Sequence, residues 1–262
     1  MLHPAAWILW AAAAALVALS TTNPFYLVLL IAVSWFVYSA HRRPGPEGRS
    51  FGTFLLFALA ALVLRIALVL LGTKSPGNIY YAALEGLRLG TLLVVFGTFN
   101  SVSDPFGVLR LAPRRFHEPA LAAALALSIA PRTMVAVGRV REAQELRGIN
   151  LSKWRALPAL AVPVLESGME EAVTLAESMD SRGHGRGARS RYRPQRWSYA
   201  AVLTAIGGAL AAAAFVTSGI AGRGALIPPT DPPVWPQVSV ALAAAELLLA
   251  VPGFFPRRAD SA

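Results

Sequence analysis

Long apolar stretches separated by short polar or proline-containing breaks dominate the chain. A helix that spans a bilayer needs about 20 mostly apolar residues, within a range of about 17 to 25. Several stretches meet or approach that length, so the pattern predicts an all-α, polytopic membrane protein with about six transmembrane helices. The spans are expected at residues 5–20, 25–40, 51–72, 87–100, 198–220 and 236–253.

Polar residues, prolines or glycines break the pattern at the first two spans and within the fourth. The first two flank Thr21-Thr22-Asn23-Pro24, where the proline cannot continue the first helix and the polar side chains can satisfy freed backbone groups. We therefore expect a tight hairpin there. The fourth span is the least apolar, because Gly90, Gly97 and Asn100 interrupt it, and a start before residue 87 stays open.

Composition supports a membrane protein and removes several chemistries. The chain is 55% hydrophobic and 15% charged, which is too apolar for an ordinary soluble domain. The absence of cysteine excludes disulfides, iron–sulfur clusters and thiolate nucleophiles. Residues 1–20 lack the basic leader of a secretory signal peptide and are followed by a second apolar stretch, so we expect a first span that is retained.

The positive residues predict the orientation. Of the 24 Lys and Arg residues, three lie in 41–50, fifteen in 101–197 and two in the last six positions. Because positive residues beside spans are retained in the cytoplasm, both termini and the 101–197 segment are expected there. The chain then divides into N-terminal transmembrane helices (1–100), a cytoplasmic region (101–197) and C-terminal transmembrane helices (198–262). We expect no nucleic-acid partner, since the net charge of +10 lies in membrane-flanking loops without a recognition fold.

The 101–197 segment is itself expected to be helical. We predict one helix over 119–147, bent at Pro131, a short element over 151–160, and a helix over 164–181. The last helix has a narrow apolar seam suited to close helix crossing. Its members are Leu165, Met169, Ala172, Ala176 and Met179.

Two helix ends in this segment repeat each other with a shift of 35 positions. Glu142, Glu145, Arg147 and Gly148 lie over Glu177, Asp180, Arg182 and Gly183. Gly after a helix is a favoured C-terminal cap, and Arg beside it suits the negative end of the helix dipole. Each end therefore also presents a guanidinium fork that fits a partner's carboxylate. Two similar helix ends suggest two similar docking sites beneath the membrane.

These residues resemble the transmembrane T component of energy-coupling factor (ECF) transporters, including the CbiQ-like cobalt transport proteins. That family carries two Ala-Arg-Gly motifs at the ends of two cytoplasmic coupling helices. Here the matching triplets are Leu146-Arg147-Gly148 and Ser181-Arg182-Gly183, both without the expected Ala. Glu142-Ala143-Gln144, Ile129-Ala130-Pro131-Arg132 and the early Asn23-Pro24 also resemble the family.

The resemblance implies a set of partners and a location. The coupling helices would dock through Arg147, Gly148, Arg182 and Gly183 onto two ATP-binding-cassette (ABC) ATPases, with Glu142, Glu145, Glu177 and Asp180 supporting them. A separate membrane S component would capture the substrate, a vitamin or a transition metal ion. The chain would be a non-catalytic, multi-pass subunit of a bacterial cell membrane, without a cofactor of its own.

Other functions stay open at this point. A conventional ABC importer permease would explain Glu142-Ala143 before Gly148 as a coupling loop, but not the second Arg-Gly end. A membrane-embedded enzyme or a scaffold is a further alternative, although the sequence lacks His-Glu-x-x-His and the P-loop pattern. The four histidines have no metal-ligand spacing, so no metal site is expected.

One charged residue lies deep in an apolar span. Arg65 stands near the middle of the third span, where an ionisable side chain usually faces a partner or a cavity. Glu246 in the last span and Glu85 near the fourth are the candidate acids. We predict an Arg65–Glu246 pair, because both residues lie well inside apolar sequence. The alternative is that Arg65 reaches an interface.

Overall fold

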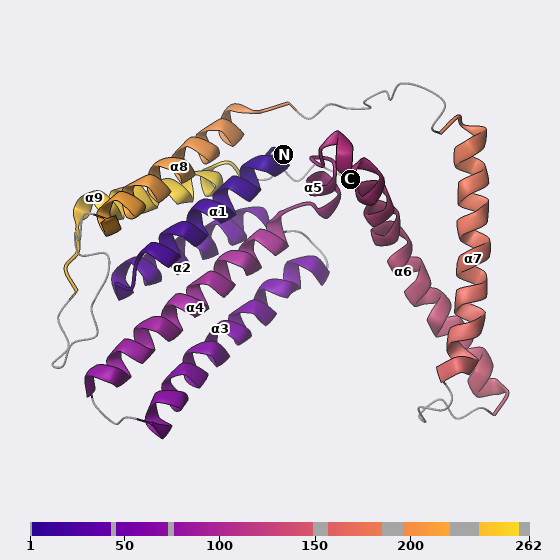
Figure 1. Cartoon of the computed structure of the whole chain (residues 1–262), viewed down its shortest axis with the longest axis horizontal. Coiled ribbons are helices and arrows are strands. Elements are labelled where there is room, and N and C mark those ends of the chain that lie inside the picture. Colours follow the sequence, from indigo (N-terminus) through magenta and orange to yellow (C-terminus); the bar gives the residue numbers. More distant parts are fainter. Residues whose placement is uncertain are drawn as a thin grey trace. The chain divides into compact units, whose positions relative to one another are not determined.

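The computed structural model describes residues 2–42, 46–72, 76–148, 157–184, 196–220 and 236–256. Within these ranges all regular structure is helical, which confirms the predicted all-α class. The chain divides into two compact units (Figure 1). Unit 1 comprises Met1–Leu111 and Gln195–Ala262, and unit 2 comprises Ala112–Pro194.

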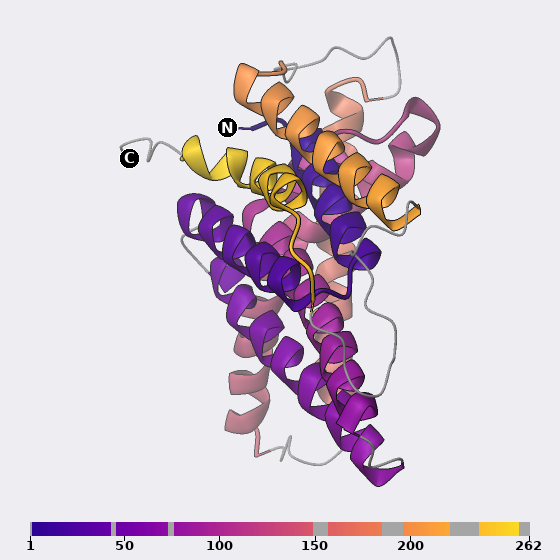
Figure 2. The same ribbon diagram turned by 90° about the vertical axis from the view of Figure 1, so that its left-hand side faces the viewer.

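Unit 1 holds most of the long apolar helices (Figure 2). Its described helices are α1 (Pro4–Ser20), α2 (Pro24–His41), α3 (Pro46–Leu71), α4 (Pro76–Val102), the short α5 (Pro105–Leu109), α8 (Tyr199–Ile220), α9 (Val240–Leu247) and the 3-10 helix η3 (Leu248–Phe254). Among them α2, α3, α4 and α8 are long and apolar enough to cross a membrane, whereas α1 and Val240–Phe254 are shorter apolar helices. The fourth span therefore begins at Pro76, eleven residues before the predicted start at 87.

The Asn23-Pro24 hairpin forms as predicted and ties two parts of the chain together. The Asn23 side chain accepts a hydrogen bond from the Phe25 amide (3.1 Å), which caps α2, and Pro24 occupies the first helical turn. The same side chain donates to the Gln237 carbonyl (2.8 Å). Tyr26 adds a second tie, because its hydroxyl accepts from the Ser239 amide (2.7 Å). The hairpin thus holds the residues that lead into α9.

A buried aromatic core lies among α1, α2, α8 and η3. Trp10 and Phe215 are fully buried, and the Tyr26 ring meets the Phe215 ring edge-on at 5.2 Å. The Trp10 indole donates to the Leu249 carbonyl (2.8 Å). That carbonyl stands three residues before Pro252, which cannot donate the 3-10 hydrogen bond of η3. The indole therefore satisfies a carbonyl that the proline leaves vacant.

Helices α3 and α4 run side by side (Figures 1 and 2) and meet along glycines. A Cβ added at Gly86, Gly90 or Gly97 would lie within 3.3 Å of α3, against Leu62, Ala58 and Phe54 respectively. Small residues allow such close approach in membranes, where packing rather than the hydrophobic effect drives helix association. The glycines that weakened the fourth span as an apolar stretch are its packing face for α3.

The Gly97 contact gives a direct test of this packing. Gly97→Ala places a methyl group 2.6 Å from Phe54 Cβ, so α3 must move, and we expect a loss of about 1–3 kcal/mol. Gly52→Ala on α3 is the matched control, because its Cβ meets nothing within 4 Å. Thermal unfolding in detergent should rank Gly97→Ala below both the parent and Gly52→Ala; equal stability would contradict the close approach.

The predicted Arg65–Glu246 pair is wrong. Arg65 Nε donates to Glu85 Oε2 (2.8 Å), and the two side chains form an ion pair. The reason is the α3–α4 contact, since Arg65 lies beside Gly86, next to Glu85. Glu246 lies on α9, which contacts α2, α8 and η3. It is fully buried, and neither of its carboxyl oxygens has a hydrogen-bond partner among the described residues.

A second cation among the apolar helices of unit 1 is satisfied by backbone carbonyls. Arg88 of α4 donates from Nε to the Ala18 carbonyl (3.1 Å) and from its terminal nitrogen to the Leu19 carbonyl. These carbonyls belong to the last turn of α1, where they have no partner within that helix. Arg88 thus caps α1 from a neighbouring helix, at the negative end of its dipole.

Candidate functional site

In its described residues, unit 2 has two long helices and a short 3-10 turn. These are η1 (Arg114–Phe116), α6 (His117–Leu146) and α7 (Leu157–Ser181). As predicted, α6 continues through Pro131. The separate element predicted over 151–160 is wrong in its second half, because α7 begins at Leu157 and continues through Pro163 into the helix predicted over 164–181. Residues 151–156 lie outside the described ranges.

The first Arg-Gly end closes α6. Gly148 has φ +75°, in the left-handed region that glycine adopts without strain. Its amide donates to the Glu145 carbonyl (3.0 Å), and the Arg147 amide donates to the Ala143 and Gln144 carbonyls (3.3 and 3.1 Å). Arg147 is exposed. The carbonyls at this helix end are therefore satisfied by its own backbone, and the guanidinium is left to point outward.

The second Arg-Gly end closes α7 with the same geometry. Gly183 has φ +76°, and its amide donates to the Asp180 carbonyl (2.8 Å). The His184 amide donates to the Met179 carbonyl (3.0 Å), which completes a Schellman cap. Arg182 is exposed, and like Arg147 it has no hydrogen-bond or ion-pair partner among the described residues. Two unpaired guanidinium groups thus stand at two matching helix ends.

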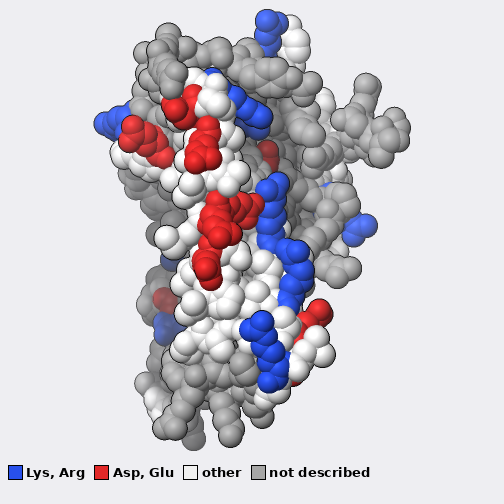
Figure 3. Space-filling view, turned by 90° about the vertical axis from the view of Figure 1, so that its right-hand side faces the viewer, with Lys and Arg blue, Asp and Glu red and all other residues white. Residues whose placement is uncertain are grey.

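The acidic residues near these ends differ in their contacts. Glu145 accepts from Arg141 Nε (2.9 Å) in an exposed pair four residues apart on α6. Glu142 and Glu177 are exposed, and Asp180 contributes its carbonyl to the cap of α7. Neighbouring columns of acidic and basic side chains occur on the face seen in Figure 3. Paired or solvated acids of this kind contribute about 0–1 kcal/mol each, so the helix ends rest on their backbone caps.

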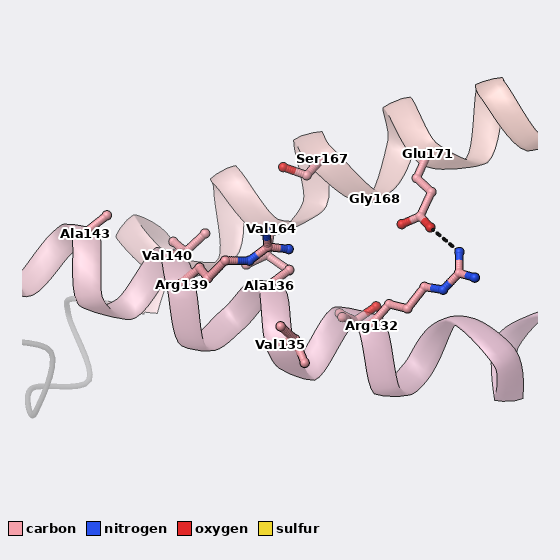
Figure 4. Close-up of a pocket in the computed structure, with 11 residues that line it drawn as sticks. Arg132, Val135, Ala136, Arg139, Val140, Ala143, Val164, Ser167, Gly168 and Glu171 are labelled. Carbon is pink, nitrogen blue, oxygen red and sulfur yellow. Dashed lines mark hydrogen bonds and ion pairs between the residues drawn. The ribbon is translucent and has the colours of Figure 1, made fainter.

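The two helices pack antiparallel over part of their length. Arg132 Nη1 of α6 donates to Glu171 Oε1 of α7 (3.2 Å), and Gln144 Nε2 of α6 donates to the Ala159 carbonyl of α7 (3.1 Å). Moving twelve residues along α6 therefore moves the contact twelve residues back along α7. Between these contacts lies an open groove (Figure 4). Its lining includes Val135, Ala136, Arg139, Val140, Val164, Ser167 and Gly168.

The apolar seam predicted for close helix crossing does not face α6. Leu165 is 65% exposed and Met169 is 70% exposed. The groove is instead lined by Val164, Ser167, Gly168 and Glu171, one step around the helix. Sequence reasoning missed the contact of Gln144 with the Ala159 carbonyl, which Pro163 leaves without its helical donor. A proline inside a helical pattern was the available signal, because it leaves a carbonyl that needs another donor.

Replacing glycine by alanine should have opposite effects on stability at the cap of α6 and in the middle of α6. Gly148→Ala puts a Cβ on a left-handed residue, which costs roughly 1–2 kcal/mol, whereas Gly138→Ala in the middle of α6 meets nothing within 4 Å and should gain about 0.5–1 kcal/mol. Hydrogen exchange in the last turn of α6 should be faster in Gly148→Ala and unchanged or slower in Gly138→Ala. Equal exchange in both variants would contradict a glycine-specific cap.

No cluster of three or more metal-ligating side chains occurs among the described residues. The fold and the helix ends define a multi-spanning helical membrane protein with a basic, helical unit between α4 and α8 in the sequence. No family model matches the chain. Comparison with curated proteins gives a more specific likeness.

The chain is similar to energy-coupling factor transporter transmembrane proteins, EcfT, which confirms the resemblance inferred from the helix ends. It is 30% identical over 152 residues to the protein of Streptococcus equi subsp. equi, covering 54% of this chain and 56% of that protein. It is 34% identical over 108 residues to that of Listeria innocua, covering 38% and 40%. The protein of Exiguobacterium sibiricum is 32% identical over 101 residues, covering 36% and 37%. The chain thus spans about half or less of the length of these relatives.

Proposed function

We propose that the chain is the transmembrane coupling subunit, or T component, of an ECF importer. Arg147 and Arg182 dock onto two ABC ATPase subunits, and ATP-driven motion of those subunits passes through α6 and α7 to a separate membrane protein that captures the substrate. The cargo class is a vitamin or a transition metal ion, bound by the capture subunit. The observation that carries the proposal is the pair of matching helix ends, each with a left-handed glycine and an exposed arginine.

The spacing of the two ends supports two separate sockets. Gln144 holds the end of α6 beside the first turn of α7. From Ala159 to Arg182 there are 23 residues, which at 1.5 Å per residue is about 35 Å. A single groove on one partner would not receive both arginines at that separation. A conventional permease, which uses one coupling loop, accounts for the first end but gives no role to the second.

Unit 2 is proposed to lie in the cytoplasm, although Glu118–Leu146 is long and apolar enough by composition to span. Its run without charged residues extends only over 119–131, and thirteen helical residues cover about 20 Å, less than the ~30 Å hydrocarbon core. The positive-residue count supports a cytoplasmic side for unit 2 and for both termini. The bilayer surrounds unit 1, where Leu56, Leu59 and Leu64 of α3 are about 60–65% exposed.

Co-purification tests the function. The tagged chain, isolated from its native host in mild detergent, is expected to bring down two ABC ATPase subunits and a small membrane protein, identified by mass spectrometry. The chain alone should hydrolyse no ATP, in keeping with a non-catalytic subunit. Recovery of the intact chain with no ATPase would contradict the proposal, and recovery with a periplasmic binding protein would favour the conventional permease.

Labelling tests the orientation independently. The chain has no cysteine, so single cysteines report accessibility without background. Labels at Gly45 and Gly187, both outside the described residues, are expected to react only from the cytoplasm. A label at Gly77, at the start of α4, should react from outside. If Gly187 reacted from outside, the coupling role would be excluded.

A further inference from the structure

Gln144 is the only buried residue among those residues of unit 2 whose side chains the structure describes. It lies three residues before Arg147, near the end of α6, where its neighbours Ala143 and Glu145 are exposed. A buried amide on an otherwise solvated helix end requires a hydrogen-bond partner. Gln144 Nε2 donates to the Ala159 carbonyl of α7 at 3.1 Å, whereas Gln144 Oε1 has no hydrogen-bond partner among the described residues.

The Ala159 carbonyl is available because of a proline. In an α-helix this carbonyl would accept from the amide of residue 163, four positions later. Residue 163 is a proline inside α7 and has no amide hydrogen. Gln144 supplies the missing donor from the other helix. The same arrangement occurs in unit 1, where the Trp10 indole donates to the Leu249 carbonyl that Pro252 leaves without its 3-10 donor.

The other tie between the helices is weaker. Arg132 and Glu171 form an ion pair, but their side chains are 75% and 45% exposed, so water and salt screen the pair. The groove between the ties leaves space, since a Cβ added at Gly168 would meet nothing within 4 Å. The contact of Gln144 with Ala159 is therefore the main fixed point between α6 and α7.

We propose that Gln144 is a positioning residue that joins α6 to α7, so that the two coupling ends move together. It connects the turn that ends in Arg147 to the first turn of α7, whose other end carries Arg182. Displacement of the Arg147 end is then transmitted to α7 through a hydrogen bond to a carbonyl that Pro163 frees. The structural part of this inference is independent of the partners; its meaning for transport rests on the proposed function.

A distance measurement between α6 and α7 in the full chain tests the joint, by which we mean the hydrogen bond from Gln144 to the Ala159 carbonyl. Spin labels on single cysteines at Ser128 of α6 and Thr174 of α7, both exposed, lie beyond the Arg132–Glu171 tie in the antiparallel register. Gln144→Ala and Gln144→Glu, whose carboxylate cannot donate, are expected to broaden the distance distribution and shift it to longer distances. Arg132→Gln is the matched control and should change it little.

Two further variants separate the hydrogen bond from simple packing. Gln144→Met keeps the length of the side chain but cannot donate, and it should broaden the distribution as Ala does; a wild-type distribution would overturn the proposal. Pro163→Ala restores the helical donor to Ala159, so it should loosen the joint by itself. Gln144→Ala should then add nothing in that background. Equal broadening by Gln144→Ala in both backgrounds would show that the vacant carbonyl has no role.

Co-purified ATPase measured on the same variants separates this inference from the proposed function. If the wild-type chain captures ATPases and the Gln144 variants keep a wild-type distance distribution, the joint is disproved and the function stands. If the distances respond as expected but the wild-type chain captures no ATPase, the function is disproved and the joint stands. If the joint and the proposed function both hold, the Gln144 variants should bind ATPases and yet lose uptake, because docking survives while transmission fails.

Discussion

Replacing Arg147 and Arg182 together by alanine is expected to release the ATPase subunits while leaving the chain inserted in the membrane. Both side chains are exposed and unpaired among the described residues, so their loss should not unfold unit 2. In a docked complex each guanidinium would become a buried partner of a carboxylate. Removing one member of a buried charge pair costs about 3–5 kcal/mol, or on the order of a hundred- to several-thousand-fold in affinity. Each single change should weaken capture, and the double change should abolish it.

Arg141→Ala is the matched control for that experiment. Arg141 lies on the same helix, less than two turns before Arg147, and is already paired with Glu145 in an exposed contact, which is worth about 0–1 kcal/mol. It should leave ATPase capture nearly unchanged. Lysine at 147 and 182 should rescue poorly, because an ammonium lacks the planar fork of two parallel donors. Normal assembly and uptake by the double alanine variant would contradict the docking role.

Local rules predicted the parts of the fold that depend on neighbouring residues in sequence. The caps at Gly148 and Gly183 follow from glycine after a helical run, and both adopt the expected left-handed backbone. The hairpin at Asn23-Pro24 follows from a capping side chain before a proline. In each case the contacting atoms belong to residues that are close in sequence, so the sequence alone predicts the contact.

Tertiary contacts decided the features that the sequence missed. The predicted break between the elements over 151–160 and 164–181 does not occur, because Gln144 of another helix donates to the carbonyl that Pro163 leaves vacant and α7 continues. The glycines at 90 and 97 suggested a weak span, but they are where α3 approaches α4. The spacing of apolar residues shows that a helix has an apolar face, but it does not show which face a neighbouring helix covers. Met169 of the predicted apolar seam stays exposed.

The partner of Arg65 is the clearest of these cases, and a double-mutant cycle tests it. Depth in apolar sequence favoured Glu246, whereas the α3–α4 contact selects Glu85. Arg65→Met and Glu85→Gln should each destabilise the protein in detergent, since each leaves a charge within the apolar unit without its partner. The double variant should cost less than the sum of the two, with a coupling of about 0.5–3 kcal/mol. Additive effects would contradict the pair.

Glu246 provides the control for this cycle and a prediction of opposite sign. Arg65→Met combined with Glu246→Gln should be additive, because the two side chains lie on helices that do not pair.

Glu246→Met is expected to raise thermal stability, since a buried carboxyl whose oxygens have no partner among the described residues costs about 1–3 kcal/mol. A marked loss of stability instead would show that Glu246 is held by a group outside the described residues. If Glu246→Met is stable but defective in uptake, the carboxyl is retained for function, and the unit proposed to sit in the bilayer contains a second element of the transport mechanism besides the coupling ends.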